Sequence, residues 1–305
     1  MNHPSALTAL AFAVLTFGFS HSSSAQGCSD AGVCTAGSLG HGPSEGAQWN
    51  VGLNYGVGEQ GILYLDAELG VVLPWGEANR FDLRLPFRSI FGDLDHVSGL
   101  ADVQATWIRN WSLGESSEFS STVGIRIPTG DANGSTEAGM ALPMPYQTTL
   151  GTVDLLLGAS YRHNHWLMSA GYQQPLTSNR NGYLAENDSL SETPFPSTRN
   201  FERKGDVVAR FGRQFGQDKD AWVFSASALG IYHLGLDRYE SPEGEKIEIA
   251  GSDGITLNLT GSVRRNFTDN QALVLDLGFP LLVREVRPDG LTRGFVLGLR
   301  WRQGF

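Results

Sequence analysis

The sequence predicts an all-β protein, a transmembrane antiparallel β-barrel of about twelve strands, with ten to fourteen as the range. Apolar and polar residues alternate along long segments, as in "RFDLRLPFR" at 80–88, and this period of two is typical of strands with one apolar face. The segments have about 10 to 13 residues, whereas strands of soluble proteins usually have about 5 or 6. Long and short connections alternate, which indicates a barrel with short periplasmic turns and longer outer loops.

The chain begins with a predicted signal peptide. An apolar run at 6–19 is followed by small residues that end at Ala25. Such a run is too short for a typical transmembrane helix and precedes a small-residue exit, so we expect cleavage after Ala25. The first five residues contain no Lys or Arg, which leaves a buried N-terminal helix as the alternative. The predicted organisation is therefore a signal at 1–25, a periplasmic segment at 26–46 that is a candidate plug, and the barrel at 47–305.

The two cysteines of the chain, Cys28 and Cys34, lie in the predicted periplasmic segment. The periplasm is oxidising, so a disulfide that closes a small loop is the first interpretation. A metal site with His41 is one alternative, although two Cys and one His leave a ligand missing. A lipid anchor on Cys28 is another, although "AQGC" lacks the aliphatic residue expected before a lipoprotein cysteine. We predict no metal and no cofactor.

Twelve segments follow in which the alternation is clear, and turn residues separate them. The fifth, seventh and ninth connections, at 129–148, 176–204 and 234–253, are long, while the even-numbered connections that alternate with them are short. All long connections therefore fall at one end, the outer one. The predicted strands are 47–57, 61–72, 79–89, 99–110, 118–128, 149–162, 165–175, 205–215, 221–233, 254–265, 271–283 and 293–305.

Aromatic residues support the same architecture. Tryptophans at or near segment ends are typical of the girdles that barrels place at membrane interfaces. The last segment alternates to an aromatic end at Phe305, which resembles the signal that outer-membrane barrels present to their insertion machinery. The girdle candidates are Trp49, Trp107, Trp111, Trp166, Trp222 and Trp301.

If the apolar faces meet lipid, the alternate faces line the lumen. Arginines and carboxylates occur there in similar numbers, so they are expected either to pair across the lumen and close it or to form a ladder that orients polar solutes. We expect a mostly filled lumen with a narrow path. The lumen-lining candidates are Tyr64, Asp66, Glu68, Asp82, Arg84, Arg88, Asp102, Gln104, Arg126, Asp154, Arg162, Arg210, Asn258, Arg264, Asp276, Arg300 and Arg302.

One longer pattern resembles a known family. "GLADVQATWIRNW" is followed by "STVGIRIPTGDANGS" and then by "LGTVDLLLGASYRHN", so that 97–175 carry a Gly-x-x-Asp strand, a strand ending in Pro-Thr-Gly-Asp, and a Leu-Gly-x-x-Asp strand. This order resembles the outer-membrane barrel family labelled for the meta pathway of phenol degradation. The resemblance implies a barrel that transports small organic molecules and fixes no substrate. Pro128 and Gly130 also have a plain structural interpretation as the end of a strand and the start of a turn.

The expected function is passive passage of small solutes, amphipathic or aromatic ones among them, across the bacterial outer membrane. The net charge of −10 disfavours nucleic acid as a partner. Expected partners are outer-membrane lipid, the insertion machinery and a solute. A non-conducting structural or adhesive barrel that acts through its long loops is the alternative. An outer-membrane lipid hydrolase is the second, but no Ser–His–acid set converges around His96 or His233, so we predict no enzyme and no catalytic residue.

Overall fold

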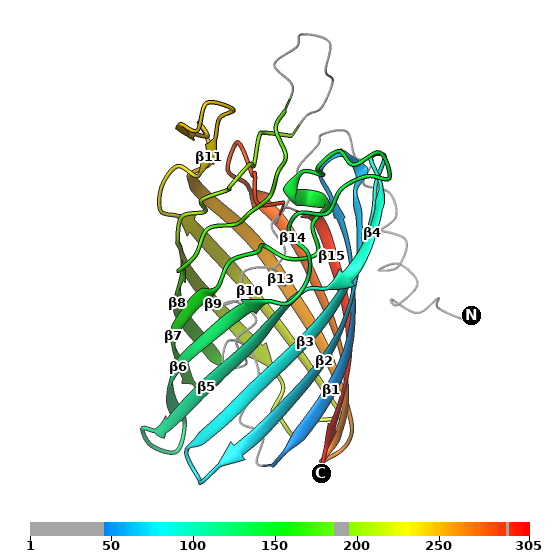
Figure 1. Ribbon diagram of the computed structural model, residues 1–305. Helices are drawn as coiled ribbons and strands as arrows, with labels where there is room; N and C mark the ends of the chain where they lie inside the picture. Colours follow the sequence, from blue (N-terminus) through cyan, green and yellow to red (C-terminus); the bar gives the residue numbers. More distant parts are fainter. Residues whose placement is uncertain (1–45, 186–194, 291–292) are drawn as a thin grey trace, which may run out of the picture.

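The computed structural model describes residues 46–185, 195–290 and 293–305, which form a closed antiparallel β-barrel (Figure 1). The described sheet has thirteen strands, and β4 continues into β5 along the same neighbour, β3, so the wall is twelve strands around. The strands are β1 (Gln48–Gly58), β2 (Leu63–Trp75), β3 (Asn79–Phe91), β4 (His96–Leu100), β5 (Asp102–Ser112), β6 (Ser117–Pro128), β7 (Asp154–His163), β8 (Trp166–Pro175), β9 (Asp206–Phe215), β10 (Trp222–His233), β13 (Gly254–Thr268), β14 (Gln271–Leu282) and β15 (Arg293–Gly304).

The barrel closes between its first and last strands. β1 pairs with β2 on one side and with β15 on the other, with Trp49 opposite Gln303. The backbone N–H of Phe305 donates to the carbonyl of Ala47 at 2.9 Å and extends this ladder by one bond. Every strand except β4, which pairs only with β3, has a neighbour on both sides. The membrane-spanning part of the wall therefore has no open sheet edge, as such a sheet requires.

The outer surface of the wall is apolar. Val51, Leu69 and Leu85 lie side by side on three neighbouring strands and are 42 to 48% exposed. Asp82, on the opposite face of β3, is 3% exposed. A soluble protein would bury its apolar side chains and expose its charged ones. The opposite arrangement in this barrel is favourable when lipid surrounds the wall.

Aromatic side chains gather near the short turns. Trp166 stacks on Phe211 with 5.1 Å between ring centroids, and Arg213 lies over Trp166 at 5.0 Å. Arg265 lies over Trp222 at 4.9 Å. Such arginines keep their charge in the headgroup region while their stems cover apolar surface.

The two ends of the barrel differ (Figure 1). The connections 76–78, 113–116, 164–165, 216–221 and 269–270 form the short-turn end. The connections 59–62, 92–95, 129–153, 176–205, 234–253 and 283–292 belong to the other, long-loop end. The predicted parity of the connections is therefore confirmed, and the long-loop end is the extracellular one by the general rule for these barrels.

One strand boundary and the place of one tryptophan differ clearly from the prediction. The sixth strand begins at Asp154 rather than at 149. The preceding residues bond to side chains instead of to a neighbouring strand: the hydroxyl of Thr149 donates to Asp102 and that of Thr152 donates to Asp154. Trp107 lies in the middle of β5 and not near a strand end.

The long-loop connections contain little regular structure. Two short 3-10 turns, η1 (Glu59–Gly61) and η2 (Met144–Tyr146), lie at this end. A small hairpin of β11 (Arg238–Glu240) and β12 (Lys246–Glu248) stands apart from the wall. Within the described parts of the chain, no helix is long and apolar enough to span a membrane.

Candidate functional site

The candidate site is the interior of the barrel. The lumen-lining candidates lie on alternate, inward-facing positions of their strands, opposite the exposed apolar positions. Asp66, Arg84, Gln104, Arg126 and Asp154 are nearly or fully buried there. Their inward placement gives the interior many polar and charged groups between apolar ones such as Ile108 and Leu156. Whether they line a conducting path stays a prediction.

Two arginines of β3 show how ion pairs inside the barrel run along the wall. Arg88 of β3 forms a bidentate pair with Asp66 of β2, with N–O distances of 2.8 and 3.0 Å. Arg84 lies 3.1 Å from Asp82 and 3.9 Å from Glu68. Pairs of this kind stiffen the wall and orient the side chains along it. For Arg84 and Arg88, the pairs therefore follow the wall and do not cross the lumen, which was one of the two expected arrangements.

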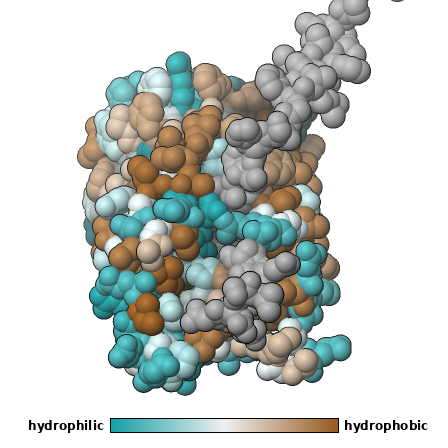
Figure 2. Space-filling view, turned by 90° about the horizontal axis from the view of Figure 1, so that it is seen from above, coloured by the Kyte–Doolittle hydropathy of each residue, from teal (hydrophilic) through white to brown (hydrophobic). Residues whose placement is uncertain are grey.

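Loop segments, rather than ion pairs across the lumen, close the long-loop end of the barrel. We call the segments 129–153, 176–185, 195–205, 234–253 and 283–290 the loop stopper. In Figure 2, which looks onto this end, polar and apolar side chains lie side by side across the part of the face in view. Asn179, Asn181 and Thr198, all in the stopper, are no more than 1% exposed. Polar loop residues this deeply buried belong to a packed structure rather than to a solvated surface.

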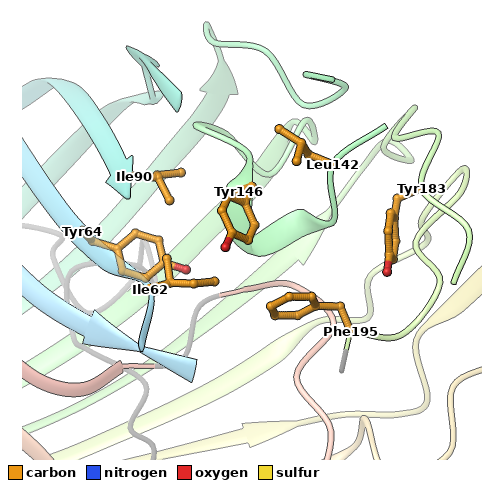
Figure 3. Packing of buried hydrophobic residues seen from close by; sticks show 7 residues of the cluster. All are labelled: Ile62, Tyr64, Ile90, Leu142, Tyr146, Tyr183 and Phe195. Carbon is orange, nitrogen blue, oxygen red and sulfur yellow. The ribbon is translucent and has the colours of Figure 1, made fainter. Parts of the chain in front are cut away.

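One half of the stopper packs through apolar side chains (Figure 3). Tyr146 and Leu142 of the loop after β6 contact a cluster that includes Ile62, Tyr64 and Ile90 at the upper wall. The hydroxyl of Tyr64 donates to the carbonyl of Pro145 at 3.0 Å. Tyr64 is thus a contact between wall and stopper, since its ring is buried at the end of the predicted lumen.

The other half of the stopper is a charged network around Arg203. This guanidinium pairs with Asp206 at the start of β9, lies 3.4 Å from Asp289 and lies 3.7 Å from Asp154 of β7. Its side chain is 1% exposed, and the three carboxylates are no more than 2% exposed. Arg203 therefore ties two loops to the inner wall, and its charge is balanced without solvent.

The network continues to a second arginine and a histidine. Arg284 pairs with Asp289 and donates to the carbonyl of Ser252 at 2.7 Å. His233 lies between two carboxylates, with Nδ1 2.7 Å from Asp206 and Nε2 2.8 Å from Asp237. Both ring nitrogens are therefore occupied by carboxylates, which leaves neither in contact with a serine hydroxyl.

The electrostatics of the network favour its charged form. Burial alone would raise the pKa of Asp289, but Arg284 and Arg203 outweigh that effect and hold the pKa below its usual range. Burial alone would likewise lower the pKa of Arg203, and the carboxylates of Asp206 and Asp289 raise it instead. Both groups are therefore ionised at neutral pH, and each depends on the other for its charge.

Below the stopper the interior opens into a cavity of about 930 Å³ at the short-turn end. We call it the vestibule. Its lining side chains include five arginines, one lysine and three aspartates, so they carry a net charge of about +3 while the whole chain carries −10. The charged lining residues are Arg80, Arg84, Arg264, Arg300, Arg302, Lys219, Asp82, Asp218 and Asp269.

The structure contains one Ser–His contact that the sequence did not predict. His96 Nε2 lies 3.2 Å from the Ser98 hydroxyl on the exposed side of β4, and Ser98 also donates to Ser89 at 3.0 Å. The period of two could have indicated it, because residues two apart share a face. The His96 ring stacks on Phe91, and the described contacts of that ring include no carboxylate.

Three sequence predictions concern the signal peptide, the cysteines and a metal site. The predicted signal peptide, the Cys28–Cys34 disulfide and the alternatives involving His41 lie outside the described residues. Among the residues that the structure does describe, no group of three or more His, Cys, Asp or Glu side chains could hold a metal ion.

The fold has counterparts among solved structures. The COG4313 outer membrane channel from Pseudomonas putida F1 is 18% identical, with a TM-score of 0.62 over 88% of this chain and 98% of that one. The chain has the fold of an outer-membrane β-barrel. The NanC porin is 9% identical with a TM-score of 0.48, covering 84% of this chain and 98% of that one. No protein-family model and no curated protein matches the chain, so the resemblance to the meta-pathway family stays a prediction.

Proposed function

We propose that this outer-membrane barrel is a channel for passive passage of small solutes, with the loop stopper as its gate. The observation that carries the proposal is the division of the interior. A polar vestibule of about 930 Å³ lies below, and folded loops rather than strands close the interior above it. Loops can move without breaking the hydrogen bonds of the wall, so a path can open while the barrel stays intact.

Two further features support a channel. The polar inner face continues from the vestibule to the stopper through Arg84, Gln104 and Arg126, so a hydrated solute would meet hydrogen-bonding groups along the way. The fold is also that of a solved outer membrane channel. Amphipathic or aromatic molecules are the solutes that the resemblance in the sequence favours.

The test compares the full chain with a variant in which residues 132–150 are replaced by a short Gly-Ser linker. Heat-modifiable gel migration first establishes that both barrels are folded. In planar bilayers we expect small or intermittent currents from the full chain and larger, steady currents from the variant. Liposome swelling with small aromatic, sugar and fatty solutes then identifies what passes. A folded variant that carries no current and admits no solute would overturn the channel.

The contact between Ser98 and His96 favours one second candidate, a lipid hydrolase on the outer face of β4. Hydrolysis needs a serine activated by an imidazole, and these two side chains meet where membrane lipid would reach them. Phospholipid hydrolysis by the purified barrel, lost in Ser98→Ala with conductance unchanged, would support this candidate. Equal rates of lipid release from both proteins would exclude it.

A further inference from the structure

The vestibule holds an arginine that has no ion-pair partner among the described residues. Arg302 of β15 lines the cavity, and among the described residues it makes no hydrogen bond or ion pair. It is close enough to Arg84, Arg264 and Arg300 for the positive charges to repel one another, and the carboxylate of Asp276 offsets only part of this repulsion. A cluster of this kind is unfavourable in a partly enclosed cavity unless an anion joins it.

The positive charges of the neighbouring arginines are balanced by carboxylates. Arg264 lies 2.6 Å from Asp218, and Arg300 lies 3.6 Å from Asp276. Arg84 has its own pairs with Asp82 and Glu68, described above. These carboxylates fix the three surrounding guanidinium groups and leave the excess charge at Arg302.

A second donor lies beside Arg302. Asn50 of β1 is directly opposite Arg302 in the ladder, lines the same cavity and is 9% exposed. Among the described residues its amide makes no hydrogen bond. On the next strand, Gly70 leaves the room that this amide occupies, because a Cβ there would lie 2.5 Å from Asn50 Nδ2.

The same ladder row ends at Arg84. It runs from Arg302 through Asn50 and Gly70 to Arg84, over four neighbouring strands. Adjacent strands are about 4.8 Å apart, so two long arginine side chains can reach toward the middle of the row from its ends. An amide and two guanidinium groups therefore share one row of the inner wall.

We propose that this row is a binding site for the oxyanion group of a small solute, a carboxylate or a phosphate. The guanidinium group of Arg302 matches two oxygens of such an anion, and Asn50 offers an amide donor beside it. The apolar side chains of Val72 and Ala272 also line the vestibule, so an anion with an organic body fits it. This inference deepens the proposed function, since the site lies where a solute would wait below the gate.

Binding is measured first, because it does not require that the gate open. The full chain is folded in detergent at low chloride concentration and titrated calorimetrically with benzoate, its neutral analogue benzamide, acetate and inorganic phosphate. We expect benzoate to bind and benzamide not to bind. Acetate tests whether the organic body contributes, and phosphate distinguishes the two oxyanions. Equal binding of benzoate and benzamide, or heat from none of the four, would overturn the site.

The variants locate the site. Arg302→Gln removes one charged donor, and we expect it to weaken benzoate binding about tenfold or more. Arg302→Lys keeps the charge but not the paired donors, so we expect an intermediate affinity. Arg265→Gln is the matched control, since that arginine lies on the outer face of the wall over Trp222. Loss of binding in the control, or none in Arg302→Gln, would contradict the assignment.

Ion selectivity separates this site from the channel itself. In a potassium chloride gradient we expect the reversal potential to show anion preference, reduced in Arg302→Gln and unchanged in Arg265→Gln. A conducting barrel without benzoate binding or anion preference would refute the site and leave the channel standing. Benzoate binding by a barrel that never conducts would keep the site and refute the channel.

Discussion

Arg203 shows how a single side chain can hold the gate. Its guanidinium is almost inaccessible to solvent and faces carboxylates from the wall and from another loop. Removing one member of a buried charge network leaves the others unpaired, which costs about 3–5 kcal/mol. At the residue scale, the stability of the stopper therefore depends on keeping this network complete.

Arg203→Ala should consequently loosen the stopper while the barrel persists. We expect higher conductance and faster protease cleavage within 195–205, with heat-modifiable migration retained. Arg238→Ala is the matched control, because Arg238 pairs with Glu248 at 2.6 Å in an exposed position, and such pairs contribute about 0–1 kcal/mol. Equal effects of the two substitutions would show that the network does not hold the gate.

Acid should release the same network. The pKa of Asp289 is lowered in the folded protein, so its ionised form stabilises the stopper at neutral pH. That contribution is complete above the ordinary carboxyl pKa of 3.8 and is lost as the pH falls below it toward the folded value. Conductance recorded from pH 7 down to 3 should therefore rise below about 4.

Asp289→Asn provides the comparison for the pH series. It should raise conductance at neutral pH and flatten the part of the response that belongs to this carboxyl group. A response below pH 4 that is as steep in Asp289→Asn as in the unchanged chain would assign it to other groups.

The sequence indicated some of these residues and not others. Alternation placed Asp154 and Arg126 on the inner face because position in a strand determines the face. It gave no role to Arg203, Arg284 or Asp289, since these lie in connections without a period. Their contacts join residues up to 86 positions apart, and only the folded loops bring them together.

At the scale of elements, the stopper depends on close approach between loops. Gly290 has a φ of +67°, and a Cβ there would lie 2.6 Å from the Cα of Pro145 in η2. Two loops that are far apart in the chain meet at this point without a side chain between them. A larger residue would have to push the β14–β15 loop away from η2.

Gly290→Ala should therefore open the stopper more than the strain of an alanine at a positive φ would do by itself. Gly244→Ala is the control: its φ is +88°, but a Cβ there would meet nothing within 4 Å. Both changes carry the strain of a left-handed alanine, about 1–2 kcal/mol, and Gly290→Ala adds a backbone collision. Protease cleavage near η2 and conductance should increase in Gly290→Ala alone. Similar behaviour of the two variants would rule out the loop contact as a cause.

Strands were predictable from sequence, and the structure of the loops was not. All twelve predicted strands are present, since lipid outside and polar groups inside impose the period of two on each. The stretch at 149–153 was assigned to a strand but belongs to the stopper, where Gly151 has a φ of +68°. The Asn- and Ser-rich loop after β8 carries no hydrophobic period, yet Asn179 and Asn181 are buried by contacts that no local pattern encodes.

At the scale of the whole molecule, the apolar band should respond to charge according to depth. Leu69 lies midway along β2 on the outer face, whereas Leu113 lies in a turn of the short-turn end. Leu69→Arg should reduce the free energy of folding into bilayers by about 2–4 kcal/mol, and Leu113→Arg by about 0–1 kcal/mol. Denaturant titrations in lipid vesicles measure both, and equal losses would place the band at a different level.

Because β1 pairs with β15, the barrel cannot close until β15 has formed. Trp49 and Gln303 are neighbours in space but lie at opposite ends of the described sequence, so the first strand keeps an unsatisfied edge until the last one arrives. Contacts of such long sequence separation form slowly, and the waiting edge is open to wrong partners. A chain cut short before residue 293 would therefore carry two unpaired edges however well its other strands had formed. Biogenesis of this protein thus depends on protecting an early strand until β15 has been synthesised.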